Sequence, residues 1–268
     1  MVLSKLKEED FAALRGPFES GRQSPGSLGG MLLFAIFLQI FVFCLVYVVI
    51  GPETTYPYNN IVLQLHLIIT VIMIMLSIVF GVPSVFKDFQ KTQYFITILV
   101  SQNMFGWYFY IAALFMIGTS DISTKSMLTF TAVTLLIGLF VFIITFIRFY
   151  ILLRKGKYRS GSGREFLRNK LEKKSLIPMA TVAGLGIVYI IQYAARNNFY
   201  KDPNEITIIL LGPILLYGML FVLPEQLVLL YCKFRFDSFN YSFEKDPDGV
   251  LKPMGIDKLT KRRENSVK

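Results

Sequence analysis

The residues best suited to chemistry lie inside long apolar runs. His66, the only histidine, shares one helical face with Thr70, Met73 and Ser77, at spacings of four, three and four residues. Polar residues are costly inside a membrane, so each is a candidate functional residue. A histidine here is suited to sensing pH or relaying a proton. Because no carboxylate occurs near it in the same half of the apolar runs, a structural hydrogen bond is the stronger prediction.

Three consecutive polar residues form a second candidate site. Ser101, Gln102 and Asn103 fall near the middle of one apolar run and are expected to point in different directions on a helix. Small and hydroxylated residues also line ordinary helix contacts in membranes, and packing is the stronger prediction for the remaining faces. Two such faces are Gln93, Thr97, Ser101, Met104 and Tyr108, and Thr131, Thr134, Gly138 and Thr145.

Glu225 is the one carboxylate within a long apolar run, where it follows Leu223-Pro224. Proline and glutamate suit the first turn of a helix, because that turn needs no donor from proline and its positive end attracts a carboxylate. Two alternatives follow. Either the span kinks with Glu225 facing protein or water, near Arg148 or Lys233, or the span ends at Leu223 and an interfacial helix begins. A structural role is the default and a gating role is the rival hypothesis.

Composition and hydropathy predict an all-α, polytopic membrane protein. The chain has 268 residues, is 54% hydrophobic and has a mean hydropathy of +0.53. Apolar runs of about 20 residues can cross a hydrocarbon core of about 30 Å, and only helices satisfy the backbone there. Six runs have this length: Met31–Ile50, Ile61–Phe80, Tyr94–Ile117, Met127–Ile147, Leu176–Ala195, and a run from Ile206 to Leu223 or Cys232.

The Lys and Arg residues predict the orientation of these spans. Lys125, Arg196 and Lys201 fall in loops on one side, and the other 25 of the 28 fall on the opposite side. The richer side is expected to be cytoplasmic, which places both termini in the cytoplasm and the protein in the cell membrane. The predicted segments are a cytoplasmic N-terminal segment 1–30, a four-helix part 31–147, a basic loop 148–175, a two-helix part 176–231 and a cytoplasmic tail 232–268.

The stretch Arg154–Lys174 carries nine Lys and Arg against two Glu. Ser162 and Glu165 form a capping box, which predicts a short basic amphipathic helix on the anionic inner leaflet. The alternatives are a solvated loop that sets topology and a docking surface for a membrane or cytoplasmic protein. The candidate lipid or partner contacts are Arg164, Arg168, Lys170 and Lys174.

The two terminal segments give weaker signals. The first 29 residues are polar and predict either a short interfacial helix or a disordered tail. Near the C-terminus, Phe239, Tyr241 and Phe243 alternate with other residues and are followed by Asp246-Pro-Asp-Gly. This pattern predicts a small hairpin or an aromatic strip against the membrane.

Several function classes are disfavoured. The sequence lacks Gly-x-Ser-x-Gly, His-Glu-x-x-His and Gly-x4-Gly-Lys-Ser/Thr motifs, so we expect no enzyme and no cofactor. Two cysteines, Cys44 and Cys232, and one histidine are too few for a tetrahedral zinc site. The net charge of +10 lies beside apolar spans, where anionic lipid explains it better than nucleic acid.

In span number, cytoplasmic termini and a possible N-terminal interfacial helix, the layout resembles six-span exporter permeases of the ABC type. The resemblance implies a transport subunit driven by a separate ATPase. Those permeases carry their coupling segment between spans two and three, whereas the long loop of this chain follows span four. Three functions remain open: a permease-like subunit that relies on a separate energy source; an accessory, assembly or immunity protein that contacts another membrane protein; and an autonomous secondary transporter, which missing repeats disfavour.

Overall fold

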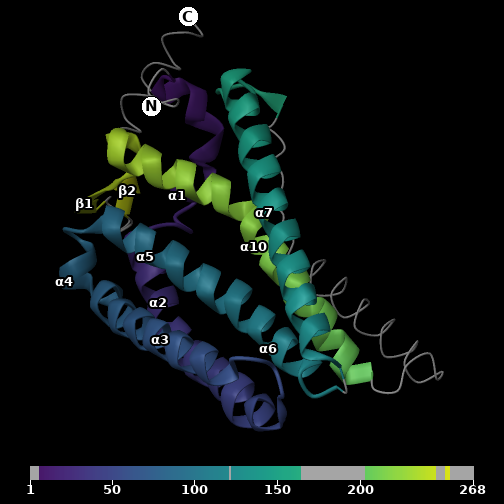
Figure 1. Ribbon diagram of the computed structural model, residues 1–268. Coiled ribbons are helices and arrows are strands. Elements are labelled where there is room, and N and C mark those ends of the chain that lie inside the picture. Colours follow the sequence, from purple (N-terminus) through teal and green to yellow (C-terminus); the bar gives the residue numbers. More distant parts are fainter. Residues whose placement is uncertain (1–5, 121, 164–202, 246–250, 254–268) are drawn as a thin grey trace, which may run out of the picture.

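The computed structural model describes residues 6–120, 122–163, 203–245 and 251–253 (Figure 1). This part of the chain is α-helical apart from one small hairpin, as expected. It contains five helical stretches that are long and apolar enough to cross a membrane. The protein is therefore a multi-pass membrane protein in its architecture. The span predicted at Leu176–Ala195 lies outside the described residues, so the count of six stays a prediction.

The first two spans cross at a pair of glycines. The first span consists of helix α2 (Pro25–Cys44), the π-helix η3 (Leu45–Ile50) and the 3-10 turn η4 (Gly51–Glu53). The second span is helix α3 (Asn59–Gly81). A Cβ atom on Gly29 would lie 2.9 Å from the Gly81 carbonyl oxygen, so this crossing requires glycine.

Helix α2 begins six residues before its apolar run because its start is set by a cap. The Ser24 Oγ accepts a hydrogen bond from the Ser27 N–H at 3.3 Å. Pro25 stands in the first turn, where no N–H is needed. Residues 25–30, which precede the apolar run, thus form the start of the first span.

The third span lies at the centre of the bundle. After the short helix α4 (Pro83–Phe86), it comprises helix α5 (Gln90–Gln102), the π-helix η5 (Asn103–Trp107) and helix α6 (Tyr108–Ile117). Of its most apolar stretch, 67% is buried, against 11 to 22% in the other four described spans. Those four therefore have most of their surface on the outside of the protein, and the third span packs against protein.

Helices α7 (Thr124–Arg154) and α10 (Pro203–Arg235) complete the described bundle (Figure 1). Helix α10 continues through both Pro213 and Pro224. The alternative in which the span ends at Leu223 and a separate helix begins is therefore wrong. Pro224 cannot donate to the carbonyl of Leu220. Beside this gap, the Gln102 Nε2 of α5 donates to the Met219 carbonyl at 3.1 Å, which supports the helix at its weak point.

One end of the bundle, here called the basal end, gathers both terminal regions of the described chain (Figure 1). It contains the 3-10 helix η2 (Glu8–Leu14), helix α1 (Gly16–Glu19), the last turns of α7 and α10, the 3-10 turn η7 (Asp237–Phe239) and the antiparallel hairpin of β1 (Tyr241–Lys245) and β2 (Leu251–Pro253). The predicted hairpin is confirmed. The other end of the bundle, with η4 and Gly118, is called the distal end.

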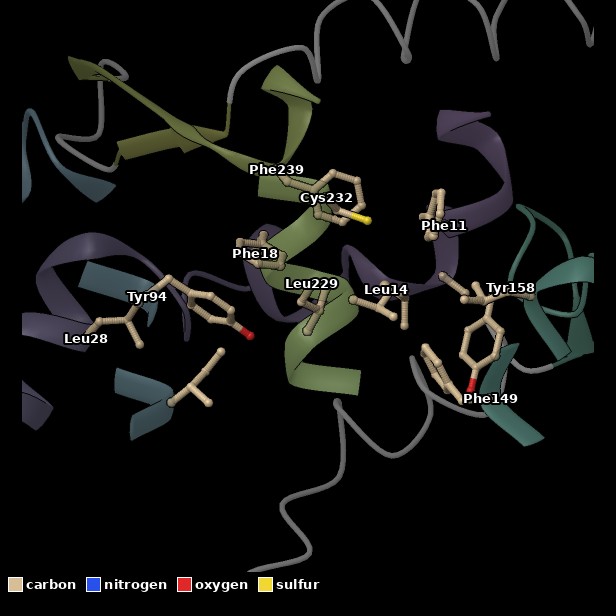
Figure 2. Packing of buried hydrophobic residues seen from close by; sticks show 14 of the residues in the cluster. Phe11, Leu14, Phe18, Leu28, Tyr94, Phe149, Tyr158, Leu229, Cys232 and Phe239 are labelled. Carbon is tan, nitrogen blue, oxygen red and sulfur yellow. The ribbon is translucent and has the colours of Figure 1, made fainter. Parts of the chain in front are cut away.

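The N-terminal segment is part of the protein core. Phe11, Leu14 and Phe18 are at most 1% exposed and pack against Leu229 and Cys232 of α10 (Figure 2). Residues 8–19 are therefore not a disordered tail but two short helices packed on the end of the bundle, and whether they also meet the membrane surface stays a prediction. Burying three large apolar side chains stabilises this position by several kcal/mol, at about 2 kcal/mol for each.

Lys233 is buried at the basal end among aromatic rings. Its ammonium group donates to the Phe239 carbonyl at 3.0 Å and lies 4.8 Å from the Phe18 ring centroid and 5.5 Å from that of Tyr94. Cation–π contacts of this kind offset part of the cost of burying a charge. The predicted position of Glu225 near Arg148 or Lys233 stays a prediction.

Hydrogen bonds from amide side chains hold the C-terminal segment against the bundle. The Gln90 side chain donates to the Tyr241 carbonyl at 2.9 Å and accepts from the Tyr241 N–H at 3.0 Å, as a neighbouring strand would. The Asn240 amide donates to the Lys233 carbonyl at the end of α10. Burial raises the pKa of Tyr241, so its hydroxyl stays protonated and donates to the Phe18 carbonyl.

Candidate functional site

His66 lies at the centre of a buried hydrogen-bonded chain. Its Nδ1 is 2.7 Å from the Tyr47 hydroxyl and its Nε2 is 3.0 Å from the Asn103 Oδ1, and the residue is 4% exposed. The amide oxygen can only accept, so Nε2 carries a proton and Nδ1 accepts from Tyr47 when the ring is neutral. The structural hydrogen bonds predicted for His66 are therefore present, and both partners are uncharged.

Both partners of His66 come from π-helical turns. Tyr47 belongs to η3 and Asn103 is the first residue of η5. A π-turn contains one more residue than an α-turn, which rotates the following side chains, and such turns are frequent at functional sites. Two independent π-helices thus direct polar side chains toward one histidine.

Tyr108 extends the polar contacts toward the middle of the bundle. Its hydroxyl is 2.7 Å from the Thr70 Oγ1, and its ring centroid is 4.4 Å from that of His66. Tyr108 is fully buried and Thr70 is 3% exposed. The polar face predicted for α3 therefore faces the central span.

Gln93 closes the same interface at the basal end. Its Nε2 donates to the carbonyls of Pro25 and Phe80, at 2.9 and 3.0 Å, and the residue is fully buried. One amide thus joins the start of α2, the end of α3 and the start of α5. Thr97, one turn later, donates to the Gln93 carbonyl at 2.9 Å.

We call the buried polar side chains between α2–η3, α3 and the central span the polar seam. All are less than 9% exposed: Gln39, Tyr47, His66, Thr70, Ser77, Gln93, Thr97, Asn103 and Tyr108. Their positions along the antiparallel helices distribute them from the distal half of the bundle to its basal end. The polar seam therefore follows the full height of the interface.

Hydrogen bonding in the polar seam is incomplete. Among the described residues, both amide atoms of Gln39, the Ser77 Oγ, the Asn103 Nδ2 and the Gln93 Oε1 are buried without a partner. Each unmade hydrogen bond of a buried group costs about 1–3 kcal/mol. These atoms include donors and acceptors but no formal charge, so the arrangement suits water or a neutral, hydrogen-bonding solute.

The predicted triplet Ser101, Gln102 and Asn103 points three ways. Ser101 donates to the Ile98 carbonyl of its own helix at 2.9 Å. Gln102 donates to α10, at the Met219 carbonyl and at the Gln226 Oε1, both at 3.1 Å, and Asn103 faces His66. Asn103 alone of the three joins the polar seam.

The other predicted site residues lie elsewhere. Glu225 is half-buried in α10, one residue from the Gln226 amide that Gln102 contacts, and within electrostatic reach of Tyr94. The candidate contacts of the basic loop, Arg164, Arg168, Lys170 and Lys174, lie outside the described residues. The functional roles of all these residues stay predictions.

A second polar interface joins α6, α7 and α10 at the face predicted for the fourth span. We call it the hydroxyl seam, and it consists of Tyr56, Tyr110, Thr131, Thr134 and Tyr217. The Tyr56 and Tyr110 hydroxyls lie 2.7 Å from the Oγ1 atoms of Thr131 and Thr134, and Tyr217 donates to the Thr134 carbonyl at 3.0 Å. Every hydroxyl in the hydroxyl seam has a partner.

Sequence reasoning missed Gln39 and Tyr47 as members of the polar seam. Gln39 is the single amide inside the run Met31–Ile50, which carries no charge. That isolation was a usable signal, because an amide in lipid must find a partner. The π-helix that orients Tyr47 has no recognisable sequence pattern.

Comparisons with known proteins give no relative: no family model, no curated protein and no solved structure matches this chain.

Proposed function

We propose that the protein is a non-enzymatic, permease-like subunit of a transport or export system in the cell membrane. A separate protein supplies its energy. The path of the transported molecule follows the polar seam between α2, α3 and the central span.

The observation that carries the proposal is the incomplete hydrogen bonding of the polar seam. A contact that serves packing alone is expected to satisfy its buried polar groups, as the hydroxyl seam does. Gln39 is fully buried with two unpartnered amide atoms, and Ser77 is fully buried with an unpartnered hydroxyl. Burying such groups in a membrane protein costs free energy. A path for a hydrogen-bonding solute requires polar groups of this kind along its wall.

The two π-helices supply a means of opening the path. A π-turn has a single extra residue, and moving that residue along the helix rotates the side chains between its old and new positions. Tyr47 and Asn103 both belong to such turns and both hold His66. A shift in either turn would break one hydrogen bond of His66. The helices could then separate along the distal half of the polar seam.

The topology of the proposal has six crossings with the basal end in the cytoplasm. Helix α7 ends at the basal end and α10 begins at the distal end (Figure 1). The sequence places 25 of 28 Lys and Arg residues on the side of both termini. The energy-supplying protein would then meet the basal end, where the N-terminal segment contacts α7 and α10.

Cysteine accessibility tests this function without a known substrate. Cys44 and Cys232 are replaced by alanine, and Ser77→Cys is reacted with a membrane-impermeant thiosulfonate in native membranes that contain all partners. The proposal predicts that Ser77→Cys reacts and that ATP depletion changes its rate severalfold. The matched control Thr134→Cys, in the hydroxyl seam, is expected to stay unreactive.

Three outcomes separate the candidate functions. Reaction at Ser77→Cys that depends on ATP supports the permease-like subunit. Reaction that is independent of any energy source favours an autonomous transporter. Absence of reaction at both positions contradicts a path through the polar seam and favours an accessory, assembly or immunity protein that acts by contact.

A further inference from the structure

We propose that the basal end of α7 is a binding site for an anionic phospholipid, whose phosphate is held by Arg154, Lys155 and Lys157. These three cations are exposed and follow one another at the end of a membrane-spanning helix. The inference concerns a different part of the molecule from the polar seam and stands independently of the proposed function.

The three cations lie in the hydrogen-bonded turn that ends α7. The Gly156 N–H donates to the Leu153 carbonyl at 3.0 Å and the Lys157 N–H to the Leu152 carbonyl at 3.1 Å, with Gly156 at φ +64°. This is the Schellman arrangement that ends helices at a left-handed glycine. A loop whose purpose is topology alone needs charge and no fixed shape, so the turn indicates a built surface.

Tyr158 anchors the turn in the core. It is 4% exposed, and its ring centroid is 5.1 Å from that of Phe149. Its carbonyl accepts a hydrogen bond from the Ala13 N–H at 2.8 Å, which ties the turn to the N-terminal segment. The cations therefore keep their positions relative to α7.

The Arg154 side chain turns back toward the membrane. Its guanidinium lies 5.9 Å from the Tyr150 ring centroid, one turn back toward the membrane. The apolar run ends at Ile147, so Tyr150 begins about 5 Å beyond the hydrocarbon core at 1.5 Å per residue. Headgroups occupy a layer of about 5–8 Å on each side of that core, and a tyrosine paired with a cation is typical of this layer.

In the described part of the chain, no carboxylate neutralises the charge at this site. Helix α7 contains no Asp or Glu. The nearby Asp10 accepts from the Arg159 Nε at 2.6 Å and is 5% exposed, so it is already paired. Within the described part of the chain, Arg154, Lys155 and Lys157 form no ion pair. Three exposed cations at the membrane-proximal end of α7, with no ion pair in the described part of the chain, complement an anionic headgroup.

An apolar surface leads directly to the cations. Ile144 and Ile147, at the end of the apolar run of α7, are 62 and 51% exposed and precede Arg154 on the membrane side. Acyl chains fit this surface while the headgroup meets the basic turn. A soluble acidic protein would use the cations but not the isoleucines, so the combined surface favours a lipid.

Native mass spectrometry of the full-length protein tests the site. The protein is exchanged into nanodiscs of phosphatidylglycerol and phosphatidylcholine in equal amounts, and lipids retained after release are counted. We expect selective retention of phosphatidylglycerol. The triple variant Arg154→Gln, Lys155→Gln, Lys157→Gln should lose it, with a decrease in affinity of roughly fivefold for each charge removed. Lys125→Gln, at the distal end of the same helix, is the matched control and should retain it.

Three results would overturn the site. Equal retention of both lipids means that contact with the apolar surface is unselective. Equal loss in the triple variant and in Lys125→Gln means that general charge is responsible. Unchanged retention of phosphatidylglycerol in the triple variant, combined with loss of a co-purifying acidic protein, means that the turn is a protein-docking surface instead.

Discussion

The polar seam and the hydroxyl seam are two buried polar interfaces of one small bundle, and they are built differently. In the hydroxyl seam each tyrosine hydroxyl meets a threonine hydroxyl or carbonyl on α7. The polar seam uses amides and a histidine, and five of its buried polar atoms have no partner among the described residues. Among the described residues, protein groups alone complete the hydrogen bonds of the hydroxyl seam, whereas five atoms of the polar seam have no protein partner.

The difference is the basis for proposing a path at the polar seam and a packing role for the hydroxyl seam. The two interfaces also differ in burial, because all residues of the polar seam are buried whereas Thr131 and Tyr217 of the hydroxyl seam are half-buried. A satisfied network fixes one arrangement, whereas an unsatisfied one leaves a free-energy gain for any molecule that completes it. We therefore expect the hydroxyl seam to be structural, and the proposed path to follow the polar seam.

The largest expected effect comes from the close contact between α10 and α6, beside the hydroxyl seam. A Cβ on Gly212 would lie 2.4 Å from the Phe109 carbonyl oxygen and 2.5 Å from the Ala113 Cβ. Gly212→Ala should therefore destabilise the protein by about 3 kcal/mol, because the helices must move apart. Thermal unfolding in detergent, followed by size-exclusion fluorescence, measures the change.

Gly218→Ala on the same helix is the matched control for that variant. No atom lies within 4 Å of a Cβ built on Gly218. Alanine is the better helix former, so this variant should unfold at the same temperature or slightly higher. Equal destabilisation by both variants would mean that α10 does not pack tightly on α6.

Asn103→Leu should have the next largest effect. It removes the acceptor of the His66 Nε2–H and leaves that buried donor without a partner. We expect a loss of about 2 kcal/mol. Chemical denaturation in mixed micelles measures it, and an unchanged midpoint would show that Asn103 does not hold the ring.

Thr134→Val removes a satisfied hydroxyl from the hydroxyl seam. The Tyr110 hydroxyl loses its partner at 2.7 Å, although the Thr131 carbonyl at 3.3 Å remains within reach. The expected destabilisation is about 1 kcal/mol in the same denaturation assay. A stabilising effect would mean that the hydroxyl of Thr134 does not contribute to stability, and the proposed difference between the two seams would be wrong.

Gln39→Leu should have the opposite sign. Gln39 is fully buried with neither amide atom paired, so an apolar side chain of similar size removes a penalty. We expect stabilisation by up to about 1 kcal/mol, together with a loss of transport once a substrate is known. Destabilisation comparable to that of Thr134→Val would show that Gln39 has a partner in the membrane.

The apolar runs of the sequence predict all five described spans, and most of their ends to within four residues, because lipid requires long apolar helices. Cap residues set the actual ends: α2 starts at Pro25, after Ser24, and not at Met31. The course of α10 past Pro224 was ambiguous, because proline suits both a kink and a new helix. The contacts of α10 with neighbouring helices determine which of the two forms, and the sequence of α10 does not show those contacts.

The candidate site was predicted in part for a similar reason. Helical spacing brought His66, Thr70 and Ser77 onto one face, and all three are buried in the polar seam. Tyr47 and Asn103 reach His66 through π-turns, which change the helical register in a way that periodicity arguments do not anticipate. The packing of the N-terminal segment depends on contacts with residues more than 200 positions away, which local patterns do not encode.

The single histidine allows the central claim to be tested directly. Protein labelled with ¹⁵N-histidine and reconstituted in lipid bilayers gives one pair of ring nitrogens in solid-state NMR spectra, both from His66. If the polar seam admits water, magnetisation from water protons should reach these nitrogens within milliseconds, and one nitrogen should be protonated and the other not. Transfer from lipid chains alone, with none from water, would contradict a path through the polar seam.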